Sequence, residues 1–244
     1  MIILIFFVVH WYTSLFFQSV FHHRYAAHGM YSMSKFWERV FYIGCFITQG
    51  SSYISARAYG VLHRLHHAHT DQPDDPHSPS NDPNLFLMMW NTRNNYYAIY
   101  KGRTEVPAKF MKDLPDWKSF DRFAHNWYAR SAWIAAYTLF YFLFATEWWM
   151  FLLLPVTISI GSFQGAAVNY WAHWFGYVNF KQSNTSKNIL PVDPIFWGES
   201  FHNNHHQHPG RPNNAHRWFE VDMGYLAMRV LDWMRIIRLK PVAA

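Results

Sequence analysis

MIILIFFVVHWYTSLFFQSVF, at residues 1–21, contains no Lys, Arg, Asp or Glu. An α-helix rises roughly 1.5 Å per residue, so a helix of this length can cross the ~30 Å hydrocarbon core of a bilayer. A cleaved signal peptide would carry a basic start and a small-residue cleavage site, and this segment has neither. We therefore expect a retained transmembrane helix over 1–21, in an integral membrane protein.

Two more apolar segments lie further along the chain, at about 129–146 and 148–171. Trp148 and Trp149 stand between them, and Trp is typical of the membrane–water interface. Pro155 permits a kink in the second segment. Together these segments predict a transmembrane hairpin.

Other segments are less apolar. Residues 36–56 contain Glu38 and Arg39 and are expected to form an interfacial helix. The Pro- and Asp-rich stretch 71–84 cannot be helical throughout. The basic, amphipathic tail at about 222–240 predicts a helix on the membrane surface. We expect an all-α integral membrane protein.

Composition excludes several classes of protein. Cys45 is the only cysteine, which excludes an internal disulfide framework and a four-cysteine zinc site, and we expect it to be a buried, inert thiol. The net charge of +6 could indicate nucleic-acid binding, but no run of five Lys or Arg residues occurs. We expect no nucleic-acid partner, and we assign the positive charge to a membrane-facing protein.

The 16 histidines are clustered rather than scattered. HRYAAH spans 23–28, HRLHH spans 63–67 and HNNHH spans 202–206. Each HxxHH motif places imidazoles at i, i+3 and i+4, on one face of a helix where they can share a metal. A fourth group, in NYWAH, places Asn169 and His173 four residues apart. If 1–21 crosses once and 129–171 is a hairpin, all four groups lie on one side of the membrane, and flanking Lys and Arg residues indicate the cytoplasmic side.

Nine clustered imidazoles exceed the coordination capacity of one ion, so two metal ions are implied. Imidazole suits Fe, Zn, Cu and Ni, and it binds in its neutral form. Neutral ligands leave the ions' charge uncompensated, so carboxylates are expected around them. The nearby candidates are Asp71, Asp75, Asp193 and Glu199.

The remaining histidines are assigned smaller roles. His22 offers an alternative start for the first motif, and we favour His23. His10, His125 and His216 are expected to be ordinary amphipathic residues. His69, His77 and His208 adjoin the motifs and are only minor candidates for a supporting or substitute role.

HRYAAH, HRLHH and HNNHH, in this order, resemble the three histidine boxes of membrane fatty-acyl desaturases, especially the delta-9 or stearoyl-CoA class. The flanking strings DDPHSP at 74–79, NYWAHWFGY at 169–177 and GESFHNNHHQHP at 198–209 strengthen the resemblance. The match runs from about residue 10 to 210.

The resemblance implies a single desaturase domain over 1–244, with the family's first membrane hairpin incomplete. It implies a cytosolic helical cap that holds two iron ions, for which zinc can substitute during overexpression. Asn169 would act through a bound water. The implied direct ligands are His23, His28, His63, His66, His67, His173, His202, His205 and His206.

The implied reaction is the dioxygen-dependent insertion of a cis double bond, at delta-9, into a long acyl chain. Electrons would come from an external donor of the ferredoxin or cytochrome b5 type, because the chain carries no flavin or nicotinamide fingerprint. Animal acyl-CoA enzymes carry Arg-Asp just before the second box, whereas Val61 and Leu62 stand here. The acyl carrier therefore stays open among coenzyme A, a lipid and a carrier protein.

Two other functions remain open. A hydroxylase of alkanes, acyl chains or carotenoids would use a similar site. A non-catalytic membrane metal-binding protein would carry its ligands within the spans, whereas here they cluster at the ends of the spans.

Overall fold

The computed structural model describes residues 1–82 and 84–241. Its longest continuous helix begins with α1 (Ile2–Phe17) and continues directly into the π-helix η1 (Gln18–Ala27). The predicted helix over 1–21 is therefore present and extends to the end of the first histidine motif. Its 26 residues correspond to about 39 Å, and its most apolar window has a mean hydropathy of 1.6.

Two shorter helices follow, and each begins at a serine. The Ser34 hydroxyl accepts the Trp37 N–H at the start of α2 (Lys35–Gln49), which ends at Gly50 with φ 53° before η2 (Gly50–Ser52). The Ser55 hydroxyl caps α3 (Ala56–His69) in the same way. The expected helix over 36–56 is therefore shorter than predicted.

The central part of the described chain forms four helices, two of which are long. Asn84 caps α4 (Leu85–Tyr100), and the loop beyond it holds α5 (Ala108–Met111) and α6 (Lys118–Ala124). Asn126 then caps α7 (Trp127–Phe144), which corresponds to the apolar segment predicted at 129–146. Residues 71–82 and 84 are non-helical, as predicted.

The second predicted hairpin helix is broken. It consists of η3 (Trp148–Leu153) and α8 (Leu154–Ile158), then α9 (Ile160–Ala166), the π-helix η4 (Ala167–Trp171) and α10 (Ala172–Trp174). The two halves are bent by 76° at Ser159. The kink lies beyond Pro155, which occupies the first turn of α8. Proline is tolerated there because a backbone N–H in the first turn would have no acceptor within the helix.

The C-terminal segment departs from the all-α prediction. After α11 (His202–Gln207), α12 (Met223–Trp233) covers only part of the helix expected at 222–240. The chain then forms β2 (Ile237–Leu239), which pairs antiparallel with β1 (Tyr31–Met33). Tyr31 and Ile237 alternate with more exposed residues and are buried, so strand pairing overrides the helical tendency of the tail.

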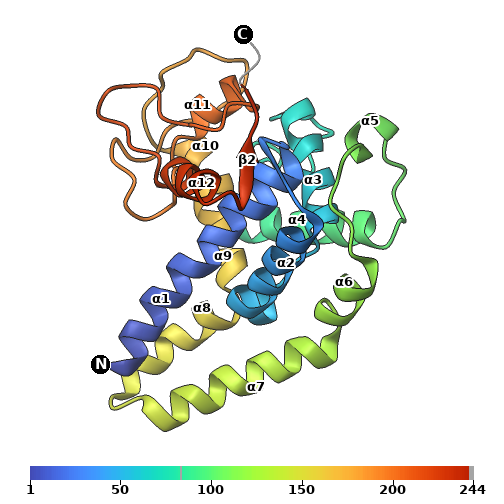
Figure 1. Ribbon diagram of the computed structural model, residues 1–244. Coiled ribbons are helices and arrows are strands. Elements are labelled where there is room, and N and C mark those ends of the chain that lie inside the picture. Colours follow the sequence, from blue (N-terminus) through green and yellow to red (C-terminus); the bar gives the residue numbers. More distant parts are fainter. Residues whose placement is uncertain (83, 242–244) are drawn as a thin grey trace.

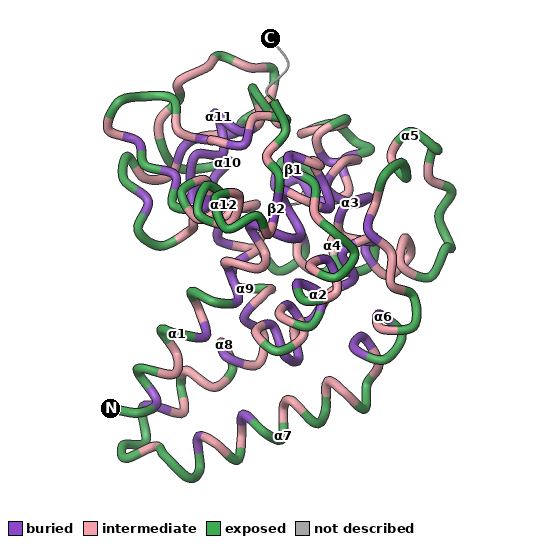
Figure 2. Tube along the Cα trace, viewed as in Figure 1, coloured by how far each residue is buried: buried purple, intermediate pink, exposed green. Residues whose placement is uncertain are grey.

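Figure 1 shows these elements as a helical head, with α1, α7 and α8 extending from it toward the N-terminus. The largest buried cluster lies in the head and includes Phe21, Tyr42 and Cys45, so the prediction of a buried thiol is confirmed. In Figure 2 the extended helices are mostly green or pink. Apolar side chains there are exposed, including Val9 on α1 and Phe142 on α7, at 53% and 71%.

Only part of the predicted membrane topology is supported by length and composition. Within residues 1–82 and 84–241, Ile2–Ala27 is the one helix apolar enough to cross a bilayer unaided. Trp148–Ile158 and Ile160–Trp174 meet the same criterion as a bent pair, whereas α7 does not meet it.

Candidate metal centre

The first histidine motif lies in the π-helix η1, where hydrogen bonds run from residue i to i+5. The His28 N–H donates to the His23 carbonyl oxygen at 3.1 Å, which is such a bond. The wide turn brings these two imidazoles to the same side of the helix. His22 faces away, and its Nε2 lies 3.1 Å from the Ile54 carbonyl oxygen.

The second motif lies on α3, which packs closely along η1. At Gly60 an added Cβ would lie 3.0 Å from the Ala26 carbonyl oxygen and 2.7 Å from a Leu114 methyl carbon. Arg64 strengthens the contact, because its guanidinium donates to the carbonyl oxygens of Ala26 and Ala27. The absence of a side chain at Gly60 lets the two histidine-bearing helices touch.

The third motif forms α11, after a turn organised by Asp193. Its carboxylate accepts the N–H groups of Ile195, Phe196, Gly198 and Ser200. Asp193 therefore contacts backbone, with no imidazole partner among the described residues. These contacts shape the turn before α11, and a role for Asp193 beside the metal ligands stays a prediction.

Nine of the predicted site histidines converge in two adjoining groups, within each of which the potential ligand nitrogens lie within 4.8 Å of one another. Both HxxHH motifs contribute to both groups, because the residues at i and i+4 enter one group and the residue at i+3 enters the other. Group one contains His23, His28, His63, His67 and His205, and group two contains His66, His173, His202 and His206.

The spacing within the groups fits metal coordination. Adjacent Nε2 atoms are 2.9–3.0 Å apart in group one, and the values for group two are 3.1–3.3 Å. Two nitrogens bound about 2.1 Å from one ion would be about 3.0 Å apart at a right angle and about 3.4 Å apart in a tetrahedral site. Five nitrogens in group one also exceed a tetrahedral set. Group one therefore fits an ion of higher coordination number than structural zinc, and the four nitrogens of group two are spaced to share one ion.

Carboxylates contact the far nitrogens of several rings. The Nδ1 atom of His66 lies 2.9 Å from both carboxylate oxygens of Asp75, and that of His23 lies 2.7 Å from Glu199. Asp71 lies 3.6 Å from Nδ1 of His173. Such contacts fix the tautomer and turn Nε2 toward the metal. Three of the four predicted carboxylates therefore lie beside site imidazoles.

Burial keeps the rings neutral. It lowers the pKa of His66, His202 and His206 well below the usual value, and neighbouring imidazoles lower it further. The same causes lower the pKa of His67 to about 3. Neutral imidazole is the form that binds a metal ion, so the site is ready for one at neutral pH.

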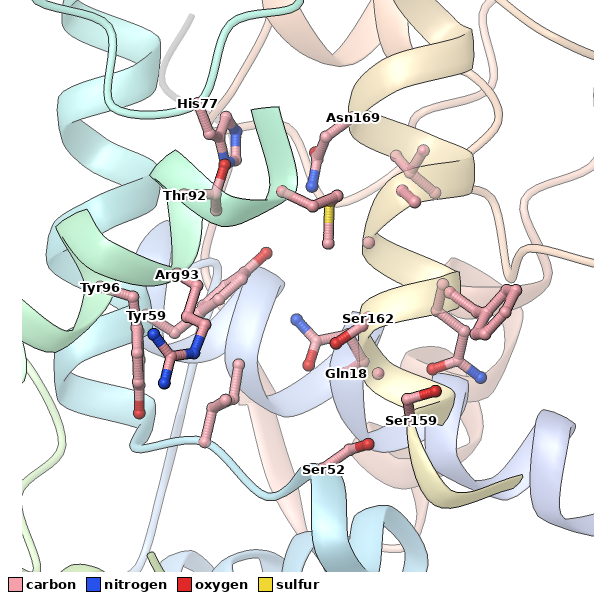
Figure 3. Close-up of a pocket in the computed structure, with 18 of the residues that line it drawn as sticks. Gln18, Ser52, Tyr59, His77, Thr92, Arg93, Tyr96, Ser159, Ser162 and Asn169 are labelled. Carbon is pink, nitrogen blue, oxygen red and sulfur yellow. The ribbon is translucent and has the colours of Figure 1, made fainter. Parts of the chain in front are cut away.

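An apolar cavity of about 690 Å³ reaches both groups. His23 and His63 of group one and His202 of group two form part of its wall, and Met88 on α4 is among its apolar residues. In Figure 3, Asn169 from η4 points into the cavity near His77, while the serines of η2 and α9 lie at the opposite end. Asn169 therefore lies where cavity and histidines meet, four residues before His173 of group two.

His77 is closer to the centre than the sequence analysis anticipated. Its ring centroid lies 4.3 Å from that of His66, and its backbone N–H donates to Asp75. Its Nε2 atom is buried and has no hydrogen-bond partner among the described residues. The available signal was its position in DDPHSP, directly after the second motif.

The other histidines lie outside both groups. His10 contacts Tyr137, His125 stacks on Tyr100, and His216 packs against Phe180. His10 and His125 are buried, whereas His216 is exposed. His69 and His208 also lie outside the groups.

Two groups of converging imidazoles at the end of an apolar helix are typical of a membrane-associated protein with a histidine-rich metal site. Comparison with known proteins narrows this class. The sequence model described as fatty acid desaturase matches residues 1–222. The chain belongs to the fatty acid desaturase family, whose members are oxidoreductases.

Individual relatives are distant but cover most of the chain. It is 26% identical to the sn-1 stearoyl-lipid 9-desaturase of Synechocystis, over 91% of this chain and 67% of that protein. It is 27% identical to delta-9 acyl-lipid desaturase 1 of Arabidopsis thaliana, over 88% of this chain and 67% of the Arabidopsis protein. It is 28% identical to acyl-CoA desaturase 1 of Saccharomyces cerevisiae, over 82% of this chain and 38% of the yeast protein.

Proposed function

We propose that this chain is a dioxygen-dependent, di-iron fatty-acyl desaturase that introduces a cis double bond at delta-9 into a long-chain acyl group. The observation that carries the proposal is an apolar cavity whose wall includes imidazoles from both histidine groups. Such a cavity can hold an alkyl chain with one methylene pair beside two metal ions. The delta-9 position rests on the names of the relatives.

The two histidine groups are the proposed ligands of the two irons, and Asn169 contributes through a water molecule. When bound, the irons supply the dioxygen and redox chemistry. Protein residues supply the geometry, because Asp75 and Glu199 hold the rings of His66 and His23 in orientation. For His173 the partner of Nδ1 is the Thr185 hydroxyl at 3.0 Å, and that hydroxyl donates to Asp71.

The cavity wall contributes the positioning. Apolar side chains of α4 exclude water and hold the acyl chain in one conformation, which fixes the carbon–carbon bond facing the imidazoles. Two protons and two electrons, equivalent to two hydrogen atoms, leave the acyl chain, while two further electrons come from an external donor and two further protons from solvent. Together they reduce one dioxygen molecule to two waters.

The whole chain is proposed to act as one desaturase domain anchored in the bilayer. Its Ile2–Ala27 helix would cross the membrane, while α7 and the bent Trp148–Trp174 segment would form the hairpin. α2 would lie at the interface, and the histidine groups would face the cytoplasm in the helical cap. The exposed apolar side chains of α1 and α7 support this arrangement, since water would disfavour them.

The test is expression in a desaturase-deficient cell, followed by mass spectrometry of the fatty acids and location of their double bonds. We expect acyl products two mass units lighter than the substrate, with the double bond at delta-9. Products sixteen units heavier would indicate a hydroxylase. Bound metal without acyl product, in the presence of a competent donor system, would indicate a metal-binding protein.

Variants link the product to the site. His67→Ala and His205→Ala each remove one ligand of group one and should abolish product while the protein still enters the membrane. His208→Ala, outside both groups, is the matched control and should retain activity. Undiminished turnover in either ligand variant would contradict the assignment.

A further inference from the structure

A second cavity, of about 410 Å³, opens on the helical head between α3, the α5 segment and the end of β2. It differs from the apolar cavity because four of its eleven described lining residues are Lys or Arg. Lys109, Lys112, Lys240 and Arg64 line it, together with the single carboxylate of Asp113. We call it the cationic pocket.

The four cations have different environments. The Arg64 guanidinium donates to the carbonyl oxygens of Phe110 and Lys112, so it ties the α5 segment to α3 and gives the pocket its shape. The three lysines are exposed, and no carboxylate of the described residues lies within 4.0 Å of their ammonium groups. Three ammonium charges are thus available to an external anion.

His28 connects this pocket with the metal centre. It is the one group-one or group-two histidine among the pocket's described lining residues, and its ring is partly exposed. Its Nε2 atom lies 3.0 Å from Nε2 of His63, inside group one. One imidazole ring therefore separates the pocket from the proposed ligand cluster, whereas the acyl cavity reaches the cluster through His23, His63 and His202.

The position of the pocket favours a soluble partner. Figure 1 shows α5 and β2 at the end of the molecule opposite the N-terminal end of α1. If α1 crosses the bilayer, the pocket lies on the part of the head far from the lipid. An anionic lipid headgroup would be expected nearer the membrane-crossing helices.

Resting on the proposed function, we infer that the cationic pocket is the docking site of an acidic, one-electron carrier protein, which reduces the metal centre through His28. Carboxylates of the carrier meet Lys109, Lys112 and Lys240, and this complementarity steers the encounter. Each carrier is oxidised by one electron, so two are consumed for each double bond. The acyl chain and the electrons then reach the metals from separate cavities.

The test measures steady-state turnover against the concentration of reduced ferredoxin or cytochrome b5. The charge-reversed triple variant K109E/K112E/K240E should raise the KM for the carrier about tenfold or more at low salt. Its turnover with dithionite, a small reductant, should match the wild type. Raising the ionic strength should increase the KM for the carrier more in the wild type than in the variant, because salt screens the attraction between lysines and carboxylates.

The matched control reverses three exposed cations elsewhere, in K101E/R103E/K181E. It changes the net charge equally and should leave the KM nearly unchanged. An unchanged KM in the pocket variant, or an equal rise in the control, would overturn the inference. The neutral variant K109Q/K112Q/K240Q should show an intermediate effect, which separates lost attraction from new repulsion.

Direct binding separates this inference from the enzyme's activity. Carrier affinity is measured for the full chain in neutral-lipid nanodiscs and should fall in K109E/K112E/K240E even if no acyl product is found. Wild-type protein that makes no product with any reductant would refute the proposed function instead. Loss of affinity for phosphatidylglycerol nanodiscs with unchanged carrier binding would assign the pocket to lipid and overturn the inference.

Discussion

At the scale of single residues, the carboxylates behind the imidazoles control the proposed metal ligands. Asp75 is buried and contacts His66 through both oxygens, and it also accepts the backbone N–H groups of Asp71 and His77. It therefore holds a proposed ligand of group two and the loop that follows the second motif.

The variant Asp75→Asn keeps the size of the side chain but removes its charge. We expect metal affinity to fall about 10- to 100-fold, because the ring of His66 loses its orienting partner. Metal content after dialysis against graded chelator measures this. Asp74→Asn changes an exposed neighbour and should leave metal content unaltered, and equal losses in both variants would show that the effect is not specific to His66.

Asn169 is expected to act on turnover more than on metal content. Its side chain faces the cavity, and its proposed contact with the centre passes through water, so Asn169→Ala removes no direct ligand. Activity should fall at least tenfold while iron per chain stays within about a fifth of the wild-type value. Parallel loss of metal and activity would make Asn169 a direct ligand or a structural residue.

The residues of the site could be predicted from the sequence, but their division into two histidine groups could not. The spacing of HxxHH predicts a shared helix face, but the assignment of His66 and His67 to different groups depends on where η1 and α11 approach α3. That Asp193 would organise a turn was also hidden, since an acidic residue near a motif has the same appearance in either role. His77 was underestimated because only the folded loop brings it against His66.

At the scale of elements, the contact between α3 and η1 brings the first two motifs together. Gly60 lies at the closest approach. Gly60→Ala should favour the isolated helix slightly but overpack the contact, with a net destabilisation of about 1–3 kcal/mol. Metal content should fall in both groups because α3 contributes to both.

Thermal unfolding in detergent and metal analysis test this prediction. Gly210→Ala is the matched control, because an added Cβ there meets no atom within 4 Å and φ is not in the left-handed region. A Gly60→Ala protein as stable and as metal-rich as the control would show that the helices tolerate a wider separation.

Some of the helices and loops could be predicted from the sequence, and others could not. Helices at the apolar segments, and the loop after α3, were predictable from composition and Pro content. The bend at Ser159 and the pairing of β1 with β2 were not, since both depend on partners distant in sequence. The π-helical form of η1 was likewise not predicted, although the five-residue spacing of His23 and His28 is compatible with it.

At the scale of the whole molecule, exposed apolar side chains on the extended helices indicate contact with lipid. Val9 is 53% exposed near the middle of α1. Val9→Asp should disfavour insertion by about 3 kcal/mol, the cost of Asp near the centre of a membrane helix. Carbonate extraction of membranes should release part of the variant protein.

Val178→Asp provides the comparison, because Val178 is similarly exposed, at 47%, but precedes Asn179, whose N–H donates to Asn203 of α11 in the head. It should remain in the membrane fraction as the wild type does. Extraction of both variants to the same extent would mean that α1 has no special relation to the bilayer.

Because α3 and α11 each contribute to both histidine groups, the loading of the two proposed ions should be coupled. The first ion to bind fixes both helices, so the second meets ligands whose conformational entropy has already been lost. Uptake should therefore be cooperative, and chains holding a single ion should be scarce in native mass spectra during titration of the apoprotein. Iron limitation would then leave a mixture of fully loaded and empty molecules rather than a population of half-assembled ones.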